Sequence, residues 1–158
     1  KYCQIDFIDI FTGKKNICSP TLMIKTDLIS KLEIFNPNYI IEDLYMLLII
    51  TDAGYLIHVL DEVLCYYRRH KENSHLNYSL IYHETIKILD LYSDYENYDL
   101  AKRHWGEGIF STMTIYHKIE AIKIIPQVFN FKLKFLIRLF KLGMPPLIWK
   151  VIKGKDRD

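Results

Sequence analysis

The order of apolar and polar residues predicts strands near the start of the chain and helices toward its end. The segment YCQIDFIDIF at residues 2–11 is rich in β-branched and aromatic residues, and TGKKN at 12–16 follows it as a turn. Pro20 removes a backbone donor, so the apolar run around it is predicted to be an edge strand or an extended loop. These signals indicate sheet structure at the beginning.

Two helices are predicted before residue 55. The first covers residues 26–32, with Thr26 as its N-cap. The second begins at Glu42 or Asp43, because acidic side chains are stabilised at the positive end of a helix dipole. Gly54 can close this helix in a left-handed conformation, and its continuous apolar residues indicate burial on most sides.

Two short β runs, at residues 55–60 and 63–67, follow the second helix. Strand, helix and strand in this order predict part of an α/β sheet. We therefore expect an α/β or α+β chain in which residues 1–77 form a partial mixed sheet with its helices. Residues 78–158 should form a largely helical C-terminal extension.

The helical spacing begins at Tyr78 and predicts three amphipathic helices. They cover residues 78–91, 98–125 and 129–142. Gly106 and Gly108 could interrupt the second helix, and Pro126 is expected to end it. A final apolar and basic stretch occupies residues 147–153.

The composition is that of one globular unit, with 158 residues of which 50% are apolar and 25% charged. No apolar run reaches the roughly 20 residues of a membrane-spanning helix, and the first residues lack the order of a signal peptide. Three widely spaced cysteines favour reduced thiols. We therefore expect a cytoplasmic protein.

The net charge of +2 hides an asymmetry. Residues 1–120 carry 12 Lys and Arg against 17 Asp and Glu, whereas residues 121–158 carry 9 against 2. Because apolar residues alternate with the basic ones, this tail fits a helix at an anionic membrane surface, or one packed on the domain or on another subunit. No nucleic-acid-binding motif is present and most of the chain is acidic, which argues against a nucleic-acid partner.

Several side chains could carry chemistry. A carboxylate at a helix N-terminus, as expected for Asp43, suits a general base, although capping of the helix alone explains the same pattern. His70 closes the second β run and could bind a divalent metal, while Arg68 and Arg69 could meet phosphate oxygens. Cys65 with the two following histidines has a spacing unlike that of zinc sites.

Four motifs occur in order along the first part of the chain: CSPTLMIK at 18–25, IEDL at 41–44, AGY at 53–55, and YRRH at 67–70 followed by Asn73 and Ser74. This ordered set resembles the acceptor-side, C-terminal half of the family-two GT-A glycosyltransferases, which build bacterial polysaccharides. The resemblance covers roughly residues 1–77, and it implies a transferase that moves a sugar from a nucleotide-sugar to a glycan or glycolipid acceptor.

The resemblance also implies roles for individual residues. The Glu42-Asp43 pair matches the catalytic pair of the family, with Asp43 as the base that deprotonates the acceptor hydroxyl and Glu42 beside it. His70 matches a residue that assists a divalent metal, Mn or Mg, and Arg69 would assist at the donor diphosphate. The reaction would invert the configuration of the transferred sugar.

Two departures from the family pattern are evident. The helix continues as LLII at residues 47–50 where many relatives carry an Arg, and the donor-binding half with its DxD motif is absent. We therefore expect a piece of a longer transferase that is inactive by itself.

Helices that follow the transferase core are common in relatives with lipid-linked acceptors, so the resemblance favours a tail bound peripherally at the inner face of the cell membrane. The residues predicted to contact a membrane or a partner are Lys134, Arg138, Lys141 and Trp149. The competing hypothesis is a non-catalytic helical module for homo-oligomerisation or membrane association.

Overall fold

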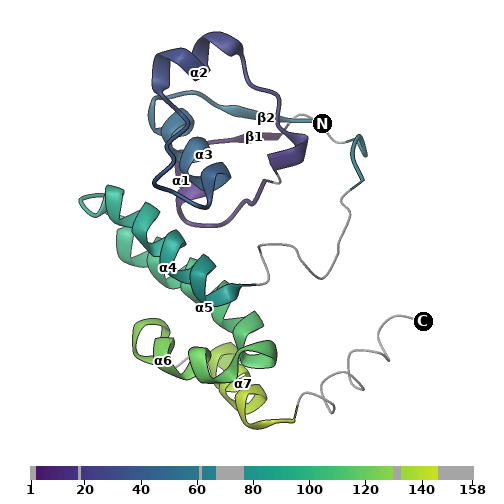
Figure 1. Ribbon diagram of the computed structural model, residues 1–158, viewed down its shortest axis with the longest axis vertical. Coiled ribbons are helices and arrows are strands. Elements are labelled where there is room, and N and C mark those ends of the chain that lie inside the picture. Colours follow the sequence, from purple (N-terminus) through teal and green to yellow (C-terminus); the bar gives the residue numbers. More distant parts are fainter. Residues whose placement is uncertain (1–2, 18, 61, 67–76, 130–132, 146–158) are drawn as a thin grey trace.

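The computed structural model describes residues 3–17, 19–60, 62–66, 77–129 and 133–145. This part of the chain is mostly helical, with one small two-stranded antiparallel sheet (Figure 1). The elements are, in order, β1 (Cys3–Ile5), α1 (Phe7–Phe11), the 3₁₀ turn η1 (Ser19–Thr21), α2 (Thr26–Leu32), α3 (Glu42–Asp52), β2 (Ile57–Val59), α4 (Tyr78–Leu89), the 3₁₀ turn η3 (Asp90–Tyr92), α5 (Tyr98–Tyr116), α6 (Lys118–Val128) and α7 (Leu133–Gly143).

The mixed sheet expected from the sequence is not formed by the described residues. Their sheet contains only β1 and β2, paired antiparallel so that Cys3 faces Val59 and Ile5 faces Ile57. The second predicted β run is also wrong at residues 63–66, which have irregular, exposed backbone. The predicted helical C-terminal region is confirmed over its described residues, 77–129 and 133–145.

The strand predicted over residues 2–11 is wrong beyond Ile5, because a helix begins there. The Asp6 carboxylate accepts a hydrogen bond from the Asp9 backbone N–H at 2.9 Å and so caps α1. Phe7, Ile10 and Phe11 recur at helical spacing and are buried. The N-cap and this spacing were both present in the sequence, but the β-rich composition obscured them.

The helices predicted at residues 26–32 and from Glu42 are confirmed as α2 and α3. Lys25, rather than Thr26, is the N-cap of α2. Gly54 follows α3 with φ +86°, and the N–H groups of Gly54 and Tyr55 donate to carbonyls in the last turn of α3. This is the left-handed ending that the sequence predicts, and glycine adopts it without steric cost.

The helix predicted over residues 98–125 is divided differently in the structure. It continues as α5 through both of its glycines and breaks at His117, and Pro126 lies inside α6 rather than after it. Gly106 faces α6 so closely that an added Cβ would lie 2.6 Å from Val128 Cγ1. Gly106 therefore allows α5 and α6 to pack closely, and it does not interrupt α5.

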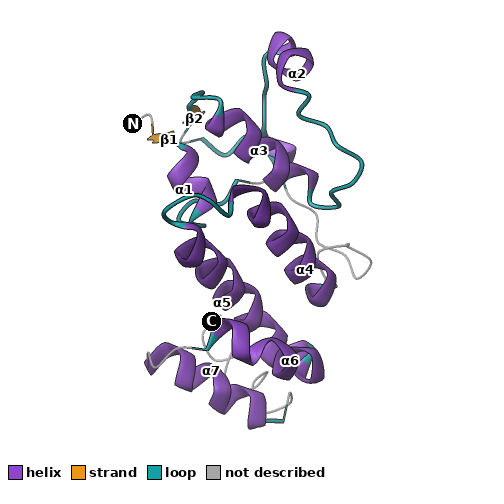
Figure 2. Ribbon diagram, turned by 90° about the vertical axis from the view of Figure 1, so that its left-hand side faces the viewer, coloured by secondary structure: helices purple, strands orange, loops and turns teal. Residues whose placement is uncertain are grey.

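Two main apolar cores hold these elements together. The first core joins β1, α1 and α3 to the end of α4 and the start of α5; its buried members are Ile5, Phe7, Ile10, Phe11, Leu44, Leu47, Leu48, Ile88, Leu89, Tyr92 and Ala101. The second core lies among α4, α5, α6 and α7; its buried members are Tyr82, Phe110, Met113, Ala121, Ile124, Val128 and Phe135. Helices α4 and α5 thus take part in both cores, and they connect the upper and lower parts of the molecule in Figures 1 and 2.

None of the described helices is both long and apolar enough to cross a bilayer.

The start of α4 provides a test of local stability. Asn77 Oδ1 accepts a hydrogen bond from the Leu80 backbone N–H at 3.2 Å, whereas Asn97 precedes α5 without a side-chain cap bond. We expect Asn77→Ala to lower the free energy of unfolding by about 1 kcal/mol, because a helix N–H loses its partner. Asn97→Ala is the matched control and should have a clearly smaller effect in thermal denaturation followed by circular dichroism. Equal losses would contradict the assignment of the cap.

Candidate functional site

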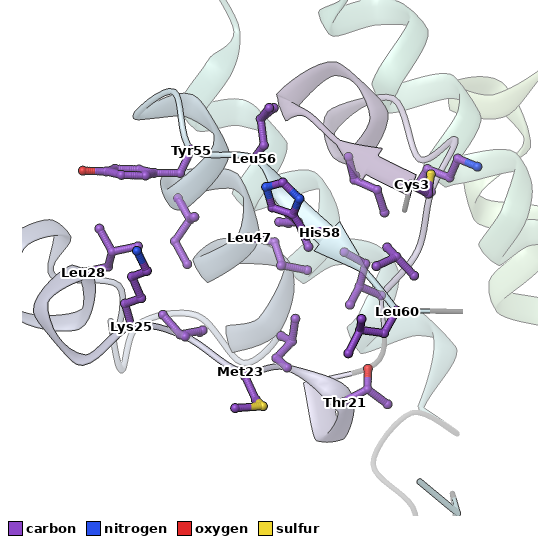
Figure 3. A pocket seen from close by; sticks show the side chains of 18 of the residues that line it. Cys3, Thr21, Met23, Lys25, Leu28, Leu47, Tyr55, Leu56, His58 and Leu60 are labelled. Carbon is purple, nitrogen blue, oxygen red and sulfur yellow. The ribbon is translucent and has the colours of Figure 1, made fainter. Parts of the chain in front are cut away.

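An open groove lies between the two-stranded sheet, helix α3 and the extended segment that leads into α2 (Figure 3). It has a volume of about 1220 Å³. Leu47 and Ile50 of α3 contribute to its lining, and Met23 and Leu60 lie at its rim. Its walls are largely apolar, which is common for sites that bind an organic ligand or a partner segment.

Asp43 lies beside one end of this groove, although it is not among the lining residues. Asp43, Leu47 and Ile50 follow one another at spacings of four and three, so they share one face of α3. Ser19 of η1 hydrogen-bonds the Asp43 carboxylate, and the next residues of η1 line the groove. The structure therefore places the predicted base next to a groove, at the helix N-terminus where it was expected.

The environment of Asp43 makes it a stronger base than a free carboxylate. Its pKa is raised from 3.8, chiefly because burial disfavours the charged form and also because the Glu42 carboxylate is adjacent. Hydrogen bonds from the Leu44 backbone N–H, at 2.8 Å to Oδ1, and from Ser19 oppose this change. The Leu44 contact also satisfies a free N–H at the start of α3, so Asp43 has the capping role as well.

Glu42 differs from Asp43 in its surroundings. It is exposed at the first position of α3, whereas Asp43 is half-buried. Its charge raises the pKa of Asp43, so it influences the candidate base through electrostatics. Of the predicted pair, Asp43 has the more suitable position for proton transfer.

The groove lining also contains polar side chains that were not identified from the sequence, among them His58, Lys15, Lys25 and the acids Asp27 and Glu62. His58 lies near the middle of the view in Figure 3, and Lys15 and Lys25 also line the groove. His58 occupies the exposed position of β2, between two half-buried residues. The alternating pattern of that strand indicated an outward side chain, but only the fold shows that it faces a groove.

The remaining predicted residues of this site, Arg68, Arg69 and His70, lie outside the described residues. Among the residues that the structure describes, no group of three or more His, Cys, Asp or Glu side chains is arranged to hold a metal ion. The described part of the chain therefore offers no fitting donor set for the Mn or Mg implied by the resemblance. A role for His70 in binding it stays a prediction.

The predicted membrane or partner contacts in the tail are only partly described. Arg138 Nη1 lies 3.1 Å from Glu107 Oε2, and both side chains are largely buried, with 20% and 17% of their surface exposed. The ion pair between Arg138 and Glu107 therefore connects α7 to α5. Lys141 is half-buried in the last turn of α7, and Lys134 lies in its first turn. Trp149 is outside the described residues.

We compared the chain with protein-family models, curated proteins and solved structures, and none of them matches it.

Proposed function

We propose that residues 1–77 form the acceptor side of an inverting GT-A glycosyltransferase, with Asp43 as the catalytic base. The observation that carries this proposal is the half-buried Asp43 carboxylate, on the same face of α3 as the Leu47 and Ile50 side chains that line the groove. The ordered motifs of the sequence supply the reaction class.

The proposed reaction begins when the Asp43 carboxylate takes the proton of an acceptor sugar hydroxyl. The hydroxyl oxygen then bonds to the anomeric carbon of a nucleotide-sugar, and the bond from that carbon to the diphosphate breaks, which inverts the configuration. The diphosphate leaves with the bonding electron pair. Lys15 and Lys25 at the groove, together with Arg68 and Arg69, are the candidates to balance its charge. The donor-binding half of the enzyme would cover the apolar groove beside the sheet.

The test is the Asp43→Asn variant of the transferase that contains this chain and its donor-binding half. Turnover should fall by about 10²–10⁴-fold, because a positioned general base contributes that much. Folding should be retained. The ionised Asp43 is destabilising in the folded state since its pKa is raised there, so Asn should slightly increase stability at neutral pH. This gain should vanish below the ordinary pKa of Asp, where the carboxyl is protonated in both states.

The matched variant is Glu42→Gln, which removes the neighbouring charge and leaves the base. Activity should rise with pH as the Asp43 carboxyl loses its proton, and the neighbouring Glu42 carboxylate raises the pKa of Asp43. The acidic limb of kcat/KM should therefore move to lower pH, with turnover largely retained. Full turnover of Asp43→Asn, or an unchanged pH profile for Glu42→Gln together with lost activity, would contradict the assigned roles.

A second candidate function is a non-catalytic module for association, and the exposed apolar side chains of α6 and α7 favour it. Under this hypothesis Asp43 caps α3 and has no catalytic role. Asp43→Asn would then leave the function of the full protein unchanged, and changes in α7 would abolish it.

A further inference from the structure

Helix α7 is apolar on two opposite sides. Its inner side holds the fully buried Phe135, with Leu139 and Leu142 packed against the second core. Its outer side presents Leu133 and Phe140, which are 72% and 71% exposed, and Leu136 and Ile137, which are about half exposed. The four outer residues are spaced by three and four, so they form one continuous row along the helix.

Helix α6 has the same organisation. Ala121, Ile124 and Val128 are buried in the second core, whereas Ile119 and Ile122 are 75% and 55% exposed. Helices α6 and α7 lie together at the end of the molecule opposite the sheet and α2 (Figures 1 and 2). The outer apolar face, defined here as Ile119, Ile122, Leu133, Leu136, Ile137 and Phe140, is thus remote from the groove.

The sequence that contains most of α6 and all of α7 is basic. Residues 121–155 contain eight Lys and Arg and no Asp or Glu. Lys123 is exposed one turn after Ile119, and positions 134 and 141 of α7 flank the outer row by helical register. The nearby acids are engaged elsewhere: Glu107 pairs with Arg138, and Glu120 Oε2 lies 3.1 Å from His117 Nδ1.

We propose that the outer apolar face binds the surface of a lipid bilayer with anionic headgroups. The apolar row of α7 would enter the boundary between headgroups and acyl chains, with the basic stems beside it reaching the headgroups. A second copy of this chain is a poorer fit, because it would bring two basic surfaces together. The inference does not depend on Asp43 or on sugar transfer.

The test is flotation of the full chain with vesicles of phosphatidylcholine alone, or of phosphatidylcholine mixed with phosphatidylglycerol. We expect binding to the anionic vesicles that weakens as the salt concentration rises from about 0.05 to 0.5 M. The double variant Leu136→Glu/Phe140→Glu should reduce the partition coefficient at least about tenfold, since two apolar side chains are lost from the lipid boundary. Leu100→Glu is the control, because Leu100 is 48% exposed at the start of α5, which packs in the first core rather than beside α6 and α7. This variant should bind the vesicles as the unmodified chain does.

The charge is tested separately by Lys123→Glu/Lys134→Glu, which should weaken binding at low salt. Arg138 is left intact because its replacement would disrupt the contact of α7 with Glu107. Circular dichroism checks that each variant is folded. Equal binding to both kinds of vesicle would overturn the proposal. An equal loss of vesicle binding for Leu100→Glu and the double variant of α7 would overturn it as well. So would a dimer in sedimentation velocity that Phe140→Glu dissociates, since a second copy would then cover the face.

Discussion

Replacing Phe135 with Ala should lower the free energy of unfolding by about 3–5 kcal/mol, the largest effect we expect from a single substitution in this protein. Phe135 is fully buried in the second core, where its ring stacks on that of Phe110 with centroids 5.4 Å apart. Phe129 contacts it edge-on at 5.5 Å. Removing the ring leaves a cavity that helices held on several sides cannot close.

The measurement is urea denaturation followed by circular dichroism, with Phe140→Ala as the control. Both residues are phenylalanines of α7, but Phe140 is 71% exposed and should change stability by only about 0.5 kcal/mol. An equal loss of unfolding free energy in the two variants would mean that the inner and outer sides of α7 are assigned incorrectly. This result would also remove the basis for the proposed membrane face.

Gly106→Ala should lower the free energy of unfolding by about 1–3 kcal/mol, although Ala is the better helix former. The new Cβ would lie 2.6 Å from Val128 Cγ1, a distance that real Cβ contacts essentially never show. Either α5 and α6 would have to move apart, or the buried and β-branched Val128 side chain would have to leave its rotamer. Overpacking should therefore outweigh the gain of up to about 1 kcal/mol from helix propensity.

Gly108→Ala is the matched control, because a Cβ at this position of α5 meets nothing within 4 Å. It should increase stability by about 0.5–1 kcal/mol through helix propensity alone. Adding Val128→Ala to the Gly106→Ala variant should recover part of its loss, which a double-mutant cycle measures as coupling. Stabilisation by Gly106→Ala, or absence of coupling with position 128, would contradict the close contact.

The sequence predicted those elements whose local signals agree. The start of α3 was correct because two acids precede a continuous apolar run, and its end was correct because Gly54 supplies the left-handed residue. The start of α4 was correct for the same kind of reason, since Asn77 precedes a helical apolar pattern. Agreement between capping and periodicity made these predictions reliable.

The predictions failed where local signals conflict or where distant contacts decide the structure. Residues 7–11 have strand-forming composition, but burial of Phe7, Ile10 and Phe11 against α3 and η3 favours a helix. Gly106 lies within α5 because it leaves room for Val128 of α6, a contact between helices that the sequence does not show. Local signals predicted the position of Asp43 at the start of α3. They could not predict the groove, because it is assembled from separate segments of the chain.

The shared helices α4 and α5 have a consequence for how this protein unfolds. Ile88 and Ala101 belong to the core around α3, while Tyr82 and Phe110 belong to the core around α7, and Ile86 packs against both. Neither core can open fully without exposing the other end of the same two helices. The chain should therefore melt in one cooperative transition, and the amides of α4 and α5 should be the slowest to exchange with deuterated solvent.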